Sequence, residues 1–139
     1  MDIEDSNGCY SEKHNKIYPA SQTWNEDISN IYCEKKAGKF YRIAKGCARP
    51  AGENYHWPGD PILQHNEYYW PGDKTLKCVK DYNGLSRFVD VTHKTCTEQD
   101  GTTRKLGKYW VDKDNQNVNC VEKNSGTEIV VEGIFSNDL

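Results

Sequence analysis

The chain has few aliphatic side chains: Ile, Leu, Val and Phe together make up about 17% of its 139 residues. So low a content is typical of disordered sequences. Two features argue against disorder here, because the net charge is only −3 and nine Tyr with four Trp supply large apolar surfaces. We therefore expect aromatic rings and covalent cross-links to take the place of an aliphatic core.

Other features are missing, and each absence excludes a class of protein. No run of about 18 apolar residues is present, so we expect no membrane insertion. A pI near 5.8 does not provide the positive field that nucleic-acid binding needs. No Cys-x-x-Cys pair exists and the histidines stand at no ligand spacing from a cysteine, so we expect no metal. Asp112-x-Asp114-x-Gln116 opens like a calcium loop but lacks its glycine and closing glutamate.

Motifs for catalysis are also missing. Acidic residues such as Glu26-Asp27 stand among lysines, which is typical of a solvated surface. No serine lies in a nucleophile elbow, and no cysteine–histidine pair suggests a nucleophile. We therefore expect a protein that is not an enzyme and takes no cofactor.

What the chain does contain is six cysteines in three similar segments. The segments are bounded by Cys9 and Cys33, Cys47 and Cys78, and Cys96 and Cys120. A tryptophan precedes each closing cysteine, at Trp24, Trp70 and Trp110, and a lysine and a glycine follow it. Internal repetition of this kind predicts three copies of one small module, at 1–46, 47–95 and 96–139.

The repeats favour one disulfide pairing, in which each module closes its own bond and gains about 3 kcal/mol from it. A competing scheme joins Cys33 to Cys47 and Cys78 to Cys96, and leaves Cys9 and Cys120 to pair across the chain. Either scheme implies an oxidising compartment. We therefore expect a secreted, extracellular protein whose signal peptide is not part of this chain.

The modules should consist almost entirely of β-strands. Short runs rich in β-branched and aromatic residues occur at 40–44, 87–92 and 127–131. Each follows a predicted hairpin turn, at Ala37-Gly38, Asn83-Gly84 and Ser125-Gly126. Two Trp-Pro-Gly-Asp segments, at 57–60 and 70–73, predict type II turns with Pro-Gly at the centre. The predicted fold is all-β, with three tandem small disulfide-linked β-hairpin modules.

The pattern of an opening cysteine, Tyr-x-x-Gly-x-x-Trp and a closing cysteine on a hairpin resembles the fibronectin type I, or finger, module. The resemblance is strongest to its nematode form in proteins similar to abnormal cell migration protein eighteen, and von Willebrand type C modules are the second choice. The chain departs from the finger pattern where Lys35, Lys80 and Lys123 or their neighbours replace a further cysteine, and where Ser21 replaces the glycine. The resemblance implies a secreted, matrix-associated binding protein without catalysis.

The second module carries an inserted segment that is dense in aromatic residues. We predict that it binds a partner protein through Tyr55, Trp57, His65, Tyr68, Tyr69 and Trp70. The alternative is that these rings form the core of the second module, since a chain short of aliphatics must bury something.

The leading functional hypothesis is an adhesion or matrix-associated protein that binds another extracellular protein. The alternative is a secreted, immunomodulatory effector or inhibitor of parasite type, which sequesters a host cytokine, protease or complement component. A carbohydrate-binding module that uses Trp57 and Trp70 as stacking platforms is a third hypothesis. The sequence holds no signal for an oligomeric state.

Overall fold

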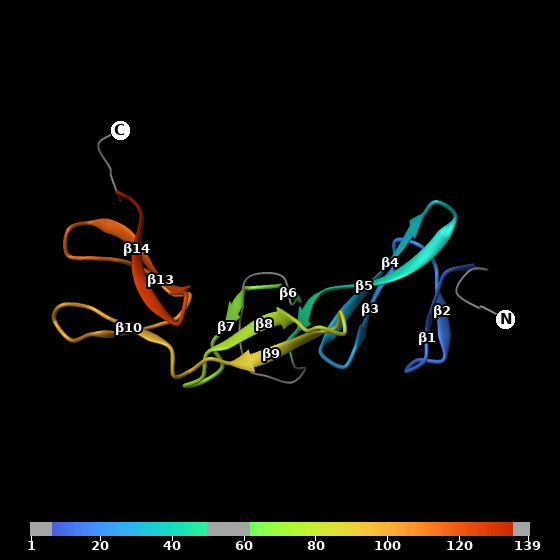
Figure 1. Cartoon of the computed structure of the whole chain (residues 1–139), viewed down its shortest axis with the longest axis horizontal. Helices are drawn as coiled ribbons and strands as arrows, with labels where there is room; N and C mark the ends of the chain where they lie inside the picture. The colour runs from blue at the N-terminus through green and yellow to red at the C-terminus, as the bar shows by residue number, and fades with distance from the viewer. Residues whose placement is uncertain (1–6, 50–61, 135–139) are drawn as a thin grey trace. The chain divides into compact units, whose positions relative to one another are not determined.

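The computed structural model of the protein describes residues 7–49 and 62–134, and strands dominate the described chain (Figure 1). The prediction of an all-β fold is confirmed. The strands are β1 (Cys9–Ser11), β2 (Lys16–Tyr18), β3 (Thr23–Glu26), β4 (Ser29–Lys36), β5 (Lys39–Ala48), β6 (Ile62–Gln64), β7 (Tyr68–Tyr69), β8 (Leu76–Lys80), β9 (Ser86–Asp90), β10 (Thr95–Thr97), β11 (Thr103–Lys105), β12 (Tyr109–Val111), β13 (Gln116–Lys123) and β14 (Gly126–Ile134).

The strands follow one plan three times: a pair of antiparallel strands precedes three strands that form a sheet. The pair β1-β2 precedes β3-β4-β5, the pair β5-β6 precedes β7-β8-β9, and the pair β10-β11 precedes β12-β13-β14. Strand β5 is long enough to serve twice, so β3-β4-β5-β6 is one four-stranded sheet. We call β1 to β5 the first repeat, β5 to β9 the second repeat and β10 to β14 the third repeat.

Each repeat is closed by one disulfide, which joins its strand pair to the middle strand of its sheet. The bonds are Cys9–Cys33, Cys47–Cys78 and Cys96–Cys120. No cysteine remains free. The pairing that the repeats favoured is therefore confirmed, and the competing scheme is not observed.

A tight turn with a left-handed residue precedes each three-stranded segment. The left-handed residues are Ser21, Asn66 and Gly107, with φ of 72°, 75° and 84°. A bond from the following N–H back to the first carbonyl closes each turn, which is the pattern of a type II turn. The left-handed residues donate their N–H groups to the carbonyls of Cys33, Cys78 and Cys120 at 2.8, 2.6 and 2.8 Å. The backbone thus ties each closing cysteine to the same kind of turn.

These turns correct the alignment of the second repeat. Trp24 and Trp110 each follow the left-handed residue by the same number of positions, and at that distance from Asn66 the chain has Tyr69, not Trp70. Tyr69 is only 2% exposed. The predicted repeat places Trp70 with the other two tryptophans, because Tyr69 and Trp70 are adjacent in the sequence. The extra residues of the second repeat lie between Cys47 and Asn66.

The three predicted hairpin strands exist, but two of their turns are shifted. Ala37 and Gly38 both have positive φ, 54° and 80°, as a type I′ turn requires. In the second repeat Gly84 donates its N–H to the Asp81 carbonyl at 3.0 Å, so Gly84 ends the turn rather than standing at its centre. The Asp81 Oδ1 atom causes the shift, because it accepts the N–H groups of Asn83 and Leu85 at 2.9 and 3.1 Å.

The hairpin turn of the third repeat is centred one residue earlier than predicted. Lys123 pairs with Gly126, so the central residues are Asn124 and Ser125. Asn124 has a φ of 52°, a conformation that asparagine tolerates better than most residues. The strand predicted at 127–131 therefore already begins at Gly126.

The predicted type II turn at 70–73 is wrong in its register. Lys74 donates its N–H to the Pro71 carbonyl at 3.0 Å, so the central residues are Gly72 and Asp73 rather than Pro71 and Gly72. Gly72 has a φ of 59° at the first central position, where glycine is favoured in a type II′ turn. The other Trp-Pro-Gly-Asp segment, at 57–60, lies outside the described residues.

The buried core of the first repeat surrounds its disulfide. It consists of Cys9, Trp24, Ile31, Cys33 and Ala44, with Tyr18 and Phe40 packed against it. An aromatic ring and a disulfide therefore occupy the place of aliphatic side chains, as the composition predicted.

The chain divides into two compact units. One unit runs to Glu67 and includes Lys77–Val89, and the other contains Tyr68–Leu76 and the chain from Asp90 onward. In the described part of the chain, no helix is long and apolar enough to cross a membrane.

Candidate functional site

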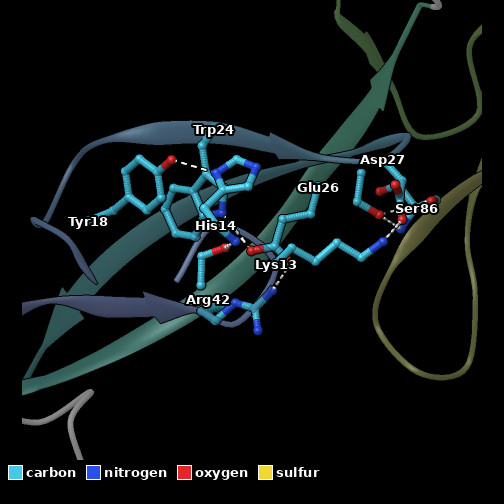
Figure 2. Close-up of polar contacts among 10 residues, drawn as sticks. Lys13, His14, Tyr18, Trp24, Glu26, Asp27, Arg42 and Ser86 are labelled. Atoms are coloured by element: carbon cyan, nitrogen blue, oxygen red, sulfur yellow. Dashed lines mark hydrogen bonds and ion pairs between the residues drawn. The ribbon is translucent and has the colours of Figure 1, made fainter. Parts of the chain in front are cut away.

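In the first repeat, a cluster of aromatic and charged side chains surrounds Trp24 (Figure 2). The Tyr18 ring stacks on the Trp24 indole, with 4.1 Å between ring centroids and 3° between ring planes. The Tyr18 hydroxyl lies 2.6 Å from His14 Nδ1, and Lys16 Nζ lies 4.9 Å from the Tyr18 ring centroid. Trp24 is consequently 6% exposed and covered by its own repeat.

Glu26 is the polar centre of this cluster. Its Oε2 atom accepts the indole N–H of Trp24 at 2.6 Å, and its Oε1 atom accepts Arg42 Nη2 at 2.6 Å. Burial alone would raise the pKa of the Glu26 carboxyl. Hydrogen bonds from Trp24 and Ser11 and the positive charge of Arg42 outweigh burial, so this pKa lies below its usual value. The first repeat therefore holds a charged carboxylate against its own arginine.

A second ion pair lies at the rim of the cluster. Lys13 Nζ contacts Asp27 Oδ2, and the two side chains are 55% and 72% exposed (Figure 2). An ion pair so open to water contributes little to stability. A variant that breaks this exposed pair is therefore a suitable control for variants of the partly buried pair between Arg42 and Glu26.

The third repeat builds a similar triad from other positions. The indole N–H of Trp110 donates to Glu98 Oε1 at 3.0 Å, and Arg104 Nε donates to Glu98 Oε2 at 2.9 Å. The Arg104 guanidinium also lies over the indole, with its Cζ atom 4.9 Å from the ring centroid. Both tryptophans thus donate to a glutamate that also binds an arginine.

Strand register shows which side chains correspond in the two repeats. Arg42 pairs with Cys33 across β4 and β5, and Ile129 pairs with Cys120 across β13 and β14. Each sheet has an irregularity at the same place, between Asn30 and Ile31 and between Asn117 and Val118. Ile129 therefore occupies in the third repeat the position that Arg42 occupies in the first.

The first and third repeats also have different residues at the position that precedes the left-handed turn residue and covers the tryptophan. Tyr18 stands as far before Ser21 as Arg104 stands before Gly107. Each lies over the tryptophan of its repeat, one as an aromatic ring and the other as a guanidinium. The cover of the tryptophan is thus kept, while its chemistry changes from an aromatic ring to a cation.

The third repeat has a cavity of about 380 Å³ next to Trp110. Its apolar lining comes from neighbouring strands, with Trp110 on β12, Val118 on β13 and Ile129 on β14. Val118 is 1% exposed, whereas Ile129 is 37% exposed. The cavity therefore has one buried apolar side and one accessible one.

Charged side chains complete the lining, and most are acidic. Four carboxylates stand against two cations, namely Glu98, Asp100, Asp112 and Asp114 against Arg104 and Lys113. Asp112 is held in place because its Oδ1 atom accepts the N–H groups of Asp114 and Gln116, each at 2.9 Å. Hydrogen bonds from Thr102 lower the pKa of Asp100, so its carboxylate is charged at neutral pH. The cavity combines an apolar side with a net negative charge.

The six predicted partner-binding residues do not share one environment in the structure. Tyr55 and Trp57 lie outside the described residues. His65 is half-buried, with Nε2 2.6 Å from Ser86 Oγ, and burial together with the charge of Lys80 lowers its pKa. Tyr69 is buried in the protein. Whether these four bind a partner stays a prediction.

Tyr68 and Trp70 are both half-buried and hydrogen bonded. The Tyr68 hydroxyl donates to Glu122 Oε1 at 3.1 Å, and burial with the charge of Glu122 raises the pKa of Tyr68. The Trp70 indole N–H donates to the Leu106 carbonyl at 2.9 Å, and Lys108 Nζ lies 4.0 Å from the Trp70 ring centroid. These contacts hold both rings against residues of the third repeat, and whether Tyr68 and Trp70 bind a partner stays a prediction.

Of the residues around Trp110, the sequence marks Asp112 and Asp114 through the pattern that opens like a calcium loop, but it does not mark Glu98 or Arg104. Trp110 itself is visible as part of the repeat, but its partners lie earlier in the chain, Glu98 directly after β10 and Arg104 on β11. A carboxylate two positions after Trp24 and after Trp110, namely Glu26 and Asp112, is the available signal. The sequence does not show which side chains these carboxylates face, because that depends on the strand register.

Within the described ranges, no three His, Cys, Asp or Glu side chains gather as they would around a metal ion. Comparisons with protein-family models, with curated proteins and with solved structures found no match to this chain.

Proposed function

We propose that the chain is a secreted protein that binds other extracellular proteins through its array of disulfide-linked repeats. The observation that carries this proposal is the set of three disulfides, each closed within one repeat. Bonds of this kind persist in oxidising compartments and stabilise small domains with little aliphatic core. Membership of the fibronectin type I-like class, with an adhesive or matrix-associated role, is part of the proposal.

A second candidate function is favoured by the differences between the repeats. The first repeat pairs the carboxylate beside its tryptophan, Glu26, with its own Arg42, whereas the third has a cavity at the corresponding place. A protein that binds through one dedicated site fits this inequality better than an array of equivalent sites does. A secreted effector that sequesters a host cytokine, protease or complement component would be such a protein.

The test is a binding assay with the oxidised, folded protein on a biosensor surface. The analytes are one panel of purified matrix proteins and one panel of plasma proteins that includes cytokines, proteases and complement components. We expect saturable binding to a member of one panel and none after reduction and alkylation of the cysteines. Absence of saturable binding to every member of both panels would count against the proposal.

Variants then distinguish the two candidates. The pair Tyr55→Ala with Trp57→Ala alters the insert without touching Asn66 or Tyr69, which the fold requires. An array of equivalent repeats should keep most of its binding in this variant and in Ile129→Arg, which fills the cavity of the third repeat. An effector with one site should lose nearly all binding in one of the two variants.

A further inference from the structure

We propose that the cavity of the third repeat binds an arginine side chain carried by an extended segment of the partner protein. This inference rests on the proposed function, because it names the group that the protein would recognise. It is argued from the first repeat, which already contains an arginine in the corresponding place.

The first repeat acts as the template. Arg42 extends from the strand position opposite Cys33 and pairs with Glu26, the carboxylate two residues after Trp24 (Figure 2). The third repeat has a carboxylate at the same distance from its tryptophan, Asp112, and it lines the cavity. Its strand position opposite Cys120 carries Ile129, which has no charge. The tryptophan and carboxylate are thus kept while the arginine is missing.

The charges of the lining favour a cation. Arg104 is paired with Glu98, so these two charges offset each other. Asp100, Asp112 and Asp114 then stand against Lys113 alone. A planar guanidinium has five N–H donors spread over three nitrogens and can reach more than one of these carboxylates, whereas a lysine ammonium has three donors on one nitrogen. Charge and geometry therefore favour arginine over lysine and over any anion.

The apolar side of the cavity suits the stem of the same side chain. Arginine buries its methylene groups along apolar surface while its charged end stays near polar groups. Val118 and Ile129 offer such a surface next to the carboxylates. A cavity of about 380 Å³ has room for one long side chain.

The strand beside the cavity points to an extended segment of a protein rather than to a free amino acid. Strand β14 is the last strand in the order β12-β13-β14, and among the described residues only side-chain contacts such as Thr127 Oγ1 to the Thr95 carbonyl, at 2.6 Å, link it to β10 beyond it. Its Ile129 and Val131 are 37% and 52% exposed. An extended segment could contact this apolar edge on both sides of its arginine.

The experiment is an NMR titration of the ¹⁵N-labelled full chain with two blocked peptides. One peptide is Ala-Val-Arg-Val-Ala, and the other has citrulline, which is neutral and nearly isosteric, in place of arginine. We expect saturable shifts of the Trp110 indole N–H and of backbone amides near Asp112 with the arginine peptide. Its affinity should exceed that of the citrulline peptide about tenfold, the difference between charge-assisted and neutral hydrogen bonds. Equal affinities, shifts elsewhere or no saturable shift would overturn the inference.

Two variants and a matched control sharpen the test. Ile129→Arg recreates the arrangement of the first repeat, and Asp112→Asn removes a charge but keeps the Oδ1 atom that holds the turn. Each should weaken the arginine peptide about tenfold, through a filled cavity or a lost ionic partner. The control is Asp81→Asn, because Asp81 Oδ1 accepts N–H groups at the same two spacings and does not line the cavity. It should leave the titration unchanged.

The peptide titration and the panel assay fail independently. If the peptide does not bind while Ile129→Arg keeps full affinity for an extracellular partner, the inference is wrong and the proposed function stands. If the arginine peptide binds selectively but no panel member does, the cavity is supported and the proposed function is not.

Discussion

The first and third repeats share a framework and differ in what lies on their tryptophans. Both have a disulfide of sequence separation 24, a left-handed turn residue bonded to the closing cysteine and the same strand irregularity. Trp24 lies under Tyr18, and its partner Glu26 binds Arg42, whereas Trp110 lies under Arg104 and beside a cavity. The same framework thus allows different side chains to cover the tryptophan.

This freedom has a physical basis. The cysteines, the turns and the strand pairs involve mostly backbone and disulfide atoms, which do not depend on the side chains at the rim. The rim positions therefore change between repeats without changing the sheet. A small disulfide-linked module can acquire a binding site in this way at little cost to its fold.

The largest expected effect is the loss of stability when either tryptophan is replaced by alanine, and the two losses can be compared directly. Trp24→Ala should destabilise the protein by about 3–5 kcal/mol, because it removes a buried, stacked ring. Trp110→Ala should cost roughly half as much, because its ring is half-buried beside a cavity. Urea unfolding followed by circular dichroism measures both, with Tyr82→Ala as a control, since Tyr82 is 96% exposed. Equal losses for the two variants would show that the packing of the two rings is equivalent.

The next effect concerns the disulfides. Replacing Cys9 and Cys33 together by alanine should cost about 3 kcal/mol, and so should replacing Cys96 and Cys120, because loops of equal length lose similar entropy on closure. Thermal unfolding of the two double variants provides the comparison. A much larger loss of stability in one repeat would mean that this repeat is stabilised mainly by its disulfide rather than by side-chain packing.

Substitutions at the left-handed turn residues should change the stability by a smaller amount. The sign of the change should differ between the third and the first repeat. Gly107→Ala should destabilise by about 2 kcal/mol, because a Cβ atom is strained at positive φ and would crowd a neighbouring ring. That Cβ would lie 2.4 Å from Cδ2 of Tyr68. Ser21→Gly should instead stabilise by about 0.5 kcal/mol, because it relieves a strained φ but loosens the unfolded chain. Chemical denaturation measures both, and a loss of stability in Ser21→Gly would contradict this account.

The sequence alone predicts the features that depend on local signals. The cysteine spacing predicted the disulfides, and glycine with β-branched residues predicted the hairpins. Asp81 illustrates a limit, since its side chain shifted a turn that Asn83-Gly84 should have centred. Tyr69 illustrates another, because a shift by one residue exchanges the two faces of a strand and makes Trp70 the wrong counterpart.

The candidate site was harder to predict than the fold. Arg42 and Glu26 meet only because β3, β4 and β5 pair in one register, and the cavity near Trp110 depends on the register of β13 and β14. A carboxylate two positions after Trp24 and after Trp110 is visible in the sequence, but the absence of an arginine opposite Cys120 is not. Such sites arise from pairings between strands, for which single residues give no signal.

The smallest expected effect is the pH dependence of the Glu26 cluster. The pKa of Glu26 is lower in the folded than in the unfolded chain, so its stabilisation is present above the unfolded pKa and is lost as the pH falls through the folded one. Glu26→Gln should therefore be less stable than the parent at pH 7, by under about 1 kcal/mol because Arg42 is partly exposed. The gap should shrink toward pH 3. Melting temperatures of both proteins across this range measure it, and Lys13→Ala, at the exposed pair, should follow the parent. A gap that persists unchanged at pH 3 would mean that Glu26 acts through packing rather than through its charge.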